Sequence, residues 1–297
     1  MKKNDNEWQM LPPTQIRVAK LGSTPSSELS LISKIFSATN PGYALYYEHS
    51  VSSIEAQAYQ QVLFVQEGAT NIELSSGERS ATTVGEIILL APGISLVADS
   101  AISVLRFRVP EGPQQDIPSF IRPDWDPKIT DKPGGCATDS NAYRRILLTW
   151  QESVGPYVFH SLNAHRVRIT DSFSHYHPLA GGFDEFYLVQ MTQPDARLLS
   201  STQVPAIEKG AQIDPSLIPN LIQTTPLEVG DLVYIPRGIM HRGVGGVLAQ
   251  VITVPGFVPG VEIGVDHHLR AINESQSLAE ADSLPYNLAA SHQPIIK

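Results

Sequence analysis

Two parts of the chain repeat one pattern, and this internal repeat constrains the fold more than any other feature. Residues Gln60–Gln66 align without gaps with Asp184–Gln190, and Gly85–Leu96 aligns in the same way with Gly230–His241. In each copy, both segments have the apolar character of short β-strands bounded by turn residues. The repeat therefore predicts two similar β-domains in one chain.

Short β-rich runs separated by turn residues continue through both halves. They are Gln61–Val65, Asn71–Leu74, Glu86–Leu90 and Ser103–Val109, followed by Arg145–Trp150, Tyr157–Phe159 and Val167–Thr170. Regular spacing of short strands indicates a sandwich or a small barrel. An alternating segment at residues 15–20 is expected to form an edge strand, and no long amphipathic helix is expected.

The second copy carries a set of potential metal ligands. His175 and His177 are separated by one residue, so on a strand their side chains point to the same side. Glu185 and His241 add a carboxylate and a third imidazole. Imidazole suits iron, zinc and nickel, and a carboxylate also suits manganese. We expect one divalent metal ion per chain, with iron first and zinc, manganese or nickel as alternatives.

The first copy lacks these ligands. The equivalent positions hold Val51, Ser53, Gln61 and Leu96, which offer neither an imidazole nor a carboxylate. We expect no metal ion in this domain and a structural role for it, either in packing on the second domain or in an oligomer interface.

The motifs resemble those of the cupin superfamily. Residues 230–241 read G-x5-P-x-G-x2-H, which is similar to the second cupin motif, and the stretch from His175 to Glu185 is similar to the first. The resemblance implies an all-β bicupin, with two double-stranded β-helix (jelly-roll) barrels in one chain. It also implies that His175, His177, Glu185 and His241 are the metal ligands. The spacing of seven residues between His177 and Glu185 is longer than the common one and prevents assignment to a subfamily.

The proline distribution predicts where the two barrels are joined. We assign residues 1–112 to a degenerate N-terminal barrel and residues 141–297 to a metal-binding C-terminal barrel with a C-terminal tail. Residues 113–140 are rich in proline and glycine and are expected to form a connector rather than a sheet.

The second copy also contains an insertion of 21 residues within Met191–Leu227. Because its ends join the strands that carry Glu185 and His241, we expect a lid over the barrel mouth. The alternative is that the insertion packs on the outside of the barrel or on a partner chain.

Two further side chains are candidates near the ligands. Tyr187 shares strand parity with Glu185 and is a candidate catalytic residue that donates a hydrogen bond to substrate, although a core aromatic fits the pattern equally well. His165 shares parity with His175, but a structural role is favoured. Asp184 is expected to face away from the ligands, and Asp266 is expected to cap a surface helix.

Composition excludes several classes of function. The chain is 42% hydrophobic and 17% charged, as in ordinary globular proteins. A net charge of −9 argues against binding to nucleic acid or to anionic membranes. A single cysteine, Cys136, and the lack of an apolar leader or spanning segment indicate a soluble cytoplasmic protein. We expect a small-molecule substrate and assembly as a homo-oligomer.

The ligand set leaves three functions open. The favoured one is an iron-dependent oxygenase that acts on a small organic molecule. The second is a metal-dependent isomerase of a keto-sugar or uronate, in which the metal polarises a carbonyl while a base moves a proton. The third is a non-catalytic protein that binds or stores a small ligand.

Overall fold

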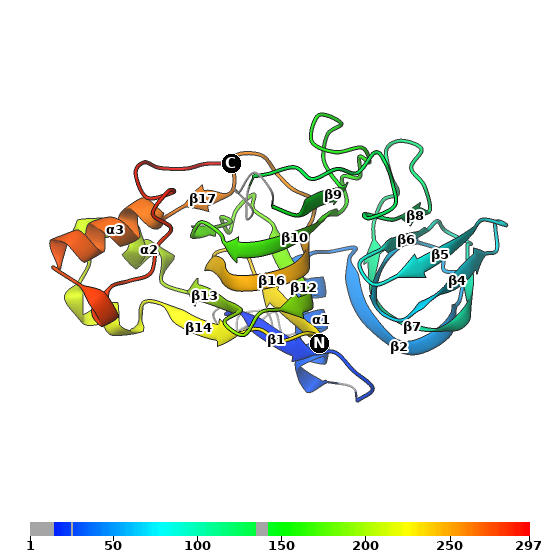
Figure 1. Ribbon diagram of the computed structural model, residues 1–297, viewed down its shortest axis with the longest axis horizontal. Helices are drawn as coiled ribbons and strands as arrows, with labels where there is room; N and C mark the ends of the chain where they lie inside the picture. Colours follow the sequence, from blue (N-terminus) through cyan, green and yellow to red (C-terminus); the bar gives the residue numbers. More distant parts are fainter. Residues whose placement is uncertain (1–14, 25, 135–141) are drawn as a thin grey trace, which may run out of the picture.

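The computed structural model describes residues 15–24, 26–134 and 142–297, and Cys136 lies outside these ranges. Figure 1 shows two β-barrels side by side, with a small helical region on the far side of the second barrel. The expected all-β class with two cupin-like barrels is confirmed. The two sheets contain seven and ten strands.

The first barrel consists of the seven-stranded sheet. Its main path runs in the order β5-β4-β7-β3-β6-β8, and β2 also pairs with β7. The strands are β2 (Ala44–Ile54), β3 (Gln60–Glu67), β4 (Ala69–Leu74), β5 (Arg79–Thr83), β6 (Ile87–Leu90), β7 (Leu96–Val109) and β8 (Phe120–Ile121).

The second barrel consists of the ten-stranded sheet, whose main path is β1-β15-β12-β16-β10-β9. The strands are β1 (Arg17–Lys20), β9 (Arg144–Leu148), β10 (Asn163–Asp171), β11 (His175–Tyr176), β12 (Asp184–Thr192), β13 (Arg197–Ser201), β14 (Gln223–Pro226), β15 (Asp231–Ile235), β16 (Met240–Val254) and β17 (Ile263–Gly264).

The repeat predicted from the sequence corresponds to equivalent strands with the same register. Gln61 lies opposite Leu90 on β6 and Arg108 on β7. Glu185, its counterpart, lies opposite Ile235 on β15 and Thr253 on β16. Because Leu90 and Ile235 are themselves counterparts in the gapless alignment, the two barrels place the aligned residues alike.

The strand pairings differ in three places from the sequence predictions. The segment at 15–20 does form an edge strand, but β1 pairs with β15 of the second barrel rather than with the first. The proline-rich connector contributes β8, which pairs with β6 at the edge of the first sheet, where proline neighbours are tolerated. The expected strand at Tyr157–Phe159 is reduced to one bridge, between Thr149 and Val158.

Helices are more prominent than the sequence analysis predicted. They are α1 (Ser27–Thr39), α2 (Val204–Ile207), α3 (Asp266–Ser275) and the 3₁₀ helices η1 (Gly210–Gln212), η2 (Pro215–Asn220) and η3 (Glu280–Asp282). The expectation of no long amphipathic helix was wrong for α1, which is 13 residues long and is capped by the Ser26 side chain. Its buried residues Ile32, Ile35 and Phe36 have the helical spacing.

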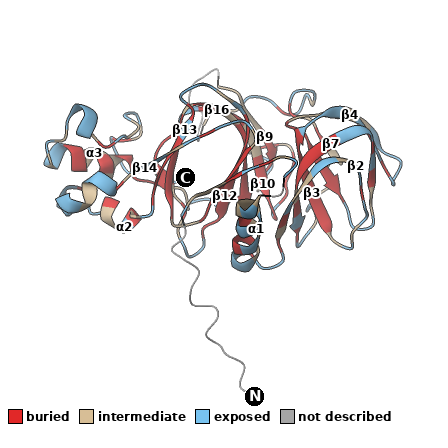
Figure 2. Ribbon diagram, turned by 90° about the horizontal axis from the view of Figure 1, so that it is seen from below, coloured by how far each residue is buried: buried red, intermediate tan, exposed pale blue. Residues whose placement is uncertain are grey.

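Three apolar cores result from the alternation of strand side chains. One core fills the first barrel, including Leu63 and Val65, and another fills the second barrel, including Tyr187 and Val189. The third lies between the barrels and α1 and includes Phe36, Phe107 and Phe186. Figure 2 shows that buried residues line both barrels and the region where they meet.

The insertion lies between β13 and β14. The equivalent strands β4 and β5 are joined by residues 75–78, whereas β13 and β14 are joined by residues 202–222. This longer connection forms α2, η1 and η2, and its buried residues Val204, Ile207 and Ile213 pack with Leu269 of α3.

Candidate metal centre

Four side chains from three strands and a neighbouring loop converge inside the second barrel. The ligand atoms of His175, His177, Glu185 and His241 all lie within 4.8 Å of one another, and all four residues are buried. We call this group the His/Glu cluster. Its members are the four residues predicted from the sequence. His175 and His241 lie directly opposite each other on β11 and β16, and Glu185 is on β12.

The Pro-x-Gly turn of the second motif holds the segment that carries His177. The Gly238 N–H donates a hydrogen bond to the carbonyl oxygen of His177 at 2.6 Å. Gly238 has φ +88°, and an added Cβ atom would lie 2.7 Å from the Leu179 side chain. The positive φ is what favours glycine here, because the exposed Leu179 side chain could move away from a Cβ atom.

Backbone carbonyls fix the tautomers of two imidazoles. The Nδ1 atoms of His175 and His241 lie 3.1 Å and 3.2 Å from the carbonyl oxygens of Phe173 and Ile239. A carbonyl only accepts, so Nδ1 carries a proton in both rings, and the unpartnered Nε2 of His175 presents a lone pair. This arrangement of a backbone acceptor behind an imidazole is usual for metal-binding histidines.

The cluster contains buried ring nitrogen atoms that are available to an external partner. His175 Nε2 and both ring nitrogens of His177 have no hydrogen-bond partner among the described residues. The third imidazole, His241, places Nε2 3.2 Å from Glu185 Oε1. Since buried polar groups normally have partners, this donor set fits a divalent cation.

The electrostatic surroundings keep two imidazoles neutral. Burial lowers the pKa of His175 well below its ordinary value of 6.5, and His241 lowers it further. Burial also lowers the pKa of His177, with additional contributions from His241 and His175. Neutral imidazole is the form that coordinates a metal ion.

Asp184, next to Glu185, anchors the cluster from the other side of β12. As expected, it faces away from the ligands, but it is buried between the barrels rather than exposed. Its carboxylate accepts hydrogen bonds from Asn40 Nδ2 at 2.6 Å and from the Tyr234 hydroxyl at 3.0 Å. The backbone N–H and Nε of Arg237 each donate to it at 3.0 Å. Asp184 thus joins α1 and the Pro-x-Gly turn to β12.

Tyr187 lies two residues after Glu185 on β12. It is fully buried among the apolar residues of the barrel interior, and its ring centroid is 6.5 Å from that of His241. It is not among the described residues that line the neighbouring pocket. Its position fits a core aromatic, and a catalytic role for Tyr187 stays a prediction.

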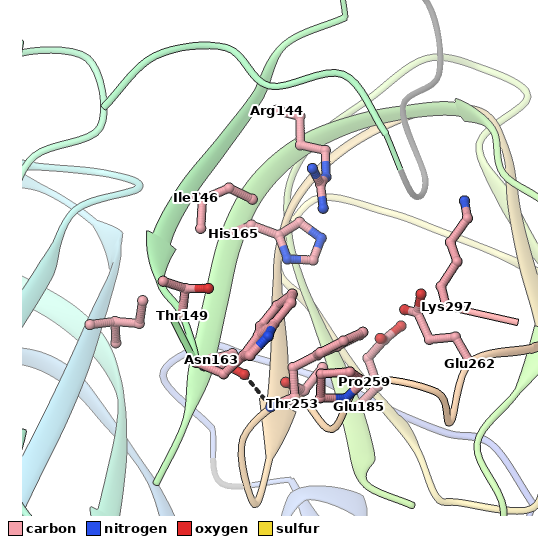
Figure 3. Close-up of a pocket in the computed structure, with 13 residues that line it drawn as sticks. Arg144, Ile146, Thr149, Asn163, His165, Glu185, Thr253, Pro259, Glu262 and Lys297 are labelled. Atoms are coloured by element: carbon pink, nitrogen blue, oxygen red, sulfur yellow. Dashed lines mark hydrogen bonds between the residues drawn. The ribbon is translucent and has the colours of Figure 1, made fainter. Parts of the chain in front are cut away.

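A pocket of about 230 Å³ adjoins the cluster and meets it at Glu185 (Figure 3). The lining residues are Arg144, Ile146, Leu148, Thr149, Trp150, Asn163, His165, Glu185, Thr253, Phe257, Pro259, Glu262 and Lys297. They come from β9 and the residues directly after it, from β10, β12 and β16, from the loop after β16 and from the C-terminal segment. Only Glu185 and His165 among them were identified as site candidates from the sequence.

Two of these residues have perturbed ionisation. Burial raises the pKa of Glu262 to about 7, with a further contribution from the nearby Glu185 carboxylate. Burial lowers the pKa of His165 to about 3, and the positive charge of Arg144 adds to the effect. Glu262 is therefore a group near the cluster that can take up or release a proton at neutral pH.

The expected lid does not cover this pocket. Among the described lining residues, none belongs to residues 202–222. The apolar side chains of the insertion are instead buried against α3, as the alternative of outside packing describes. The pocket is bordered by the loop 255–262 and by Lys297, whose backbone pairs with Glu262.

Asp266 and Gln61 are buried polar residues, and the side chain of each accepts a hydrogen bond. Asp266 begins α3 but is buried, and it accepts a hydrogen bond from the Ser174 N–H at 2.7 Å instead of capping a surface helix. In the first barrel, Gln61 is buried and accepts a hydrogen bond from Arg106 at 3.0 Å. Arg106 also pairs with Glu48.

Comparison with known proteins supports the fold. Comparison of the sequence with protein-family models and with curated proteins gives no match. Among solved structures, a single-residue variant of oxalate decarboxylase from Bacillus subtilis has a TM-score of 0.50 and 10% identity, over 95% of this chain and 84% of that chain. The chain has a cupin fold. Hazelnut (Corylus avellana) vicilin is similar with a TM-score of 0.45 and 10% identity, over 72% of this chain and 75% of its own.

At this level of identity the similarity concerns the fold alone, and the site must be argued from its own residues. Among the described residues, no helix has the length and apolar character needed to cross a membrane.

Proposed function

We propose that the His/Glu cluster binds one divalent metal ion and that the chain is a metal-dependent enzyme acting on a small organic molecule. The observation that carries the proposal is the convergence of three imidazoles and one carboxylate within 4.8 Å in a buried site. Backbone carbonyls hold Nδ1 of His175 and His241, and Nε2 of His175 and both ring nitrogens of His177 have no hydrogen-bond partner among the described residues.

The adjoining pocket supplies the place for a substrate. It meets the cluster at Glu185, and its volume of about 230 Å³ is below the range of roughly 300–1,000 Å³ typical of drug-sized ligands. A bound metal ion would act as a Lewis acid and offer coordination positions to substrate and dioxygen. The apolar wall of the pocket would exclude bulk water from the reacting group.

The finer proposal is an iron-dependent oxygenase. Three imidazoles and one carboxylate are a suitable donor set for ferrous iron, and a largely apolar pocket protects oxygen chemistry from water. A metal-dependent isomerase of a keto-sugar or uronate is the second candidate, because Glu262 faces the same pocket and titrates near neutrality. A protein that binds a small ligand without turnover is the third.

The metal site is tested by elemental analysis of His241→Ala and of His292→Ala. His241 is a buried member of the cluster, whereas His292 is exposed and lies outside it. We expect one metal equivalent per chain in the wild type and in His292→Ala, and a loss of at least about tenfold in metal affinity in His241→Ala. Full occupancy in His241→Ala, or two equivalents in the wild type, would contradict the assignment.

The reaction class is tested on protein purified with its own metal. Substrate-dependent consumption of dioxygen is expected for the oxygenase. Exchange of substrate hydrogen with deuterated water, without consumption of dioxygen and with loss of exchange in Glu262→Gln, would favour the isomerase instead. Tight binding with neither activity would indicate a binding protein.

A further inference from the structure

The pocket beside the His/Glu cluster has one continuous apolar wall. The wall consists of Ile146 and Leu148 of β9, of Trp150 just after β9, and of Phe257 and Pro259 in the loop after β16. The rings of Trp150 and Phe257 stack with centroids 4.2 Å apart. Such a wall favours a ligand that buries an apolar body, because apolar surface removed from water is stabilising.

Two cationic side chains lie at one end of the same pocket. Figure 3 shows the Arg144 guanidinium and the Lys297 ammonium on the side of the pocket away from Thr253. The backbone oxygen of Lys132 accepts a hydrogen bond from Arg144 Nη1 at 3.1 Å, which helps to position the guanidinium. Lys297 Nζ lies 4.4 Å from the ring centroid of Phe173, which in turn stacks on His175.

Buried polar atoms face the pocket at its other end. The hydroxyl groups of Thr149 and Thr253 are buried and have no hydrogen-bond partner among the described residues. The same is true of Trp150 Nε1. Thr253 lies directly opposite Glu185 in the sheet. Unpartnered buried donors that line a cavity indicate a ligand with acceptor oxygen atoms, because native proteins rarely leave such groups unsatisfied.

We propose that this pocket binds a small organic acid with an apolar body. Its carboxylate would lie at Arg144 and Lys297, its apolar part along the wall of Ile146, Leu148 and Phe257, and its reacting oxygen near Thr253 and the cluster. Only the placement of the reacting oxygen beside the cluster rests on the proposed function. The anion and apolar subsites, however, are formed by residues outside the cluster.

The charges of the pocket agree with an anionic ligand. Arg144 and Lys297 contribute two positive charges, and Glu185 belongs to the cluster, where a divalent cation would more than offset it. Glu262 is then the one other acidic group among the described lining residues. A guanidinium and an ammonium at one end of an otherwise apolar pocket provide charge-assisted hydrogen bonds to a carboxylate.

Both features of the ligand can be tested by titration calorimetry with three probes. 3-Phenylpropionate has the carboxylate and the apolar body, 3-phenylpropionamide lacks the charge, and acetate lacks the large apolar body. With the metal-loaded wild type, we expect 3-phenylpropionate to bind about tenfold or more tightly than either of the other two. Equal affinity for the acid and its amide would overturn the anion subsite, and acetate binding as tightly as 3-phenylpropionate would overturn the apolar subsite.

Substitutions locate the anion subsite. Arg144→Met and Lys297→Met are each expected to weaken 3-phenylpropionate binding by about fivefold to tenfold and to leave the amide unaffected. Lys34→Met, which removes an exposed lysine from α1, is the matched control. It is expected to leave the affinities for 3-phenylpropionate and for the amide unchanged. Because Lys297 is exposed, its variant is expected to fold even if Arg144→Met does not. Unchanged affinity in Lys297→Met and in a folded Arg144→Met, or the absence of saturable binding in the wild type, would overturn the proposal.

The metal proposal can fail separately from this one. In His241→Ala the cations and the apolar wall are retained, so the preference for the acid over the amide should persist at reduced overall affinity. A wild type that contains no metal but still discriminates the acid would refute the metal site and retain the anion subsite. A metal-loaded enzyme that binds the acid and the amide equally would retain the metal site and refute the anion subsite.

Discussion

Neighbouring residues of β12 have opposite roles because strand side chains alternate. Glu185 points into the barrel and joins the His/Glu cluster, whereas Asp184 points outward and binds Asn40, Tyr234 and Arg237. A carboxylate placed on each face therefore links the candidate metal centre to the contact between barrels. The same alternation allowed the cluster to be predicted, since His175 and His177 could be assigned to one face from spacing alone.

The residues that line the pocket could not be predicted in this way. Arg144 begins a short edge strand, Glu262 follows an irregular loop, and Lys297 is more than 30 residues further along the chain. No periodicity connects such segments, and only the folded chain brings them together. Asp266 was misjudged for a related reason, because its partner Ser174 is distant in sequence.

His165 provides a prediction about pH at the residue scale. Its pKa falls to about 3 in the fold from an ordinary value of 6.5, so the unfolded chain binds the proton first as the pH falls. The free energy of unfolding of the metal-free protein should therefore decrease below about pH 6.5, by up to about 1.4 kcal/mol per pH unit from this group, until near pH 3. His175 and His177 act in the same direction.

We expect His165→Gln to be less sensitive to acid than the wild type. Urea unfolding of the metal-free proteins at pH 7, 5.5 and 4.5 measures how steeply the free energy of unfolding falls with pH. His160→Gln, which changes an exposed histidine, should retain the wild-type slope. An identical slope in His165→Gln would show that the buried imidazole does not control acid stability.

At the scale of elements, the sequence located the insertion but not its function. Comparing the two copies showed that the second is longer, and the structure places most of the extra length in residues 202–222 between β13 and β14, where the first copy has residues 75–78. Its apolar residues pack on α3, a helix without an equivalent after β7 among the described residues that follow the first copy. The insertion and the C-terminal region therefore form a joint helical layer, which comparison of the copies alone could not reveal.

The element α1 was missed although its sequence contains the pattern of a helix. Ile32, Ile35 and Phe36 follow the helical spacing, and Ser26 is a good N-cap. The helix is short and rich in serine, so its pattern is weaker than that of the surrounding strands. Tertiary packing of Phe36 between the barrels stabilises it.

Ile207→Ala tests the joint helical layer. Ile207 is fully buried in α2 within the cluster that contains Leu269 of α3. Removal of its side chain should lower the free energy of unfolding of this region by about 2–4 kcal/mol and increase proteolysis within residues 202–222. Metal content and binding to the pocket should not change. Leu217→Ala, at a partly exposed position of the same insertion, is the control, and weaker substrate binding in Ile207→Ala alone would support the lid after all.

At the scale of the whole molecule, the two barrels share a core. Segments such as Val62–Val65 and Phe186–Val189 are apolar at successive positions, which is typical of strands buried on both faces. One face of each strand fills its own barrel, and the other contributes to the core between the barrels. The sequence therefore predicted two barrels, but the pairing of β1 with β15 across the expected domain boundary required the structure.

We predict that the chain assembles into a homodimer or a larger homo-oligomer. The first sheet ends at β5, which pairs only with β4 among the described strands, and an open edge is a liability that association removes. Light scattering at micromolar concentration should give a mass of at least twice the 32.4 kDa of one chain. A mass of 32.4 kDa over this range would contradict the prediction.

The shared core predicts that both barrels unfold together. Phe107 of the first barrel is fully buried, and its ring lies 5.8 Å from Phe36 and 5.4 Å from Phe186 of the second barrel. Phe107→Ala should lower the free energy of unfolding by about 3–5 kcal/mol, because a large aromatic side chain leaves a cavity at the contact. Metal release and loss of β-structure, followed by elemental analysis and circular dichroism during denaturation, should shift together in this variant. Val97→Ala, at an exposed position of the same strand, should shift neither metal release nor the loss of β-structure. If Phe107→Ala produced an early loss of β-structure without earlier metal release, the two barrels would be separate folding units and the core between them a weak contact.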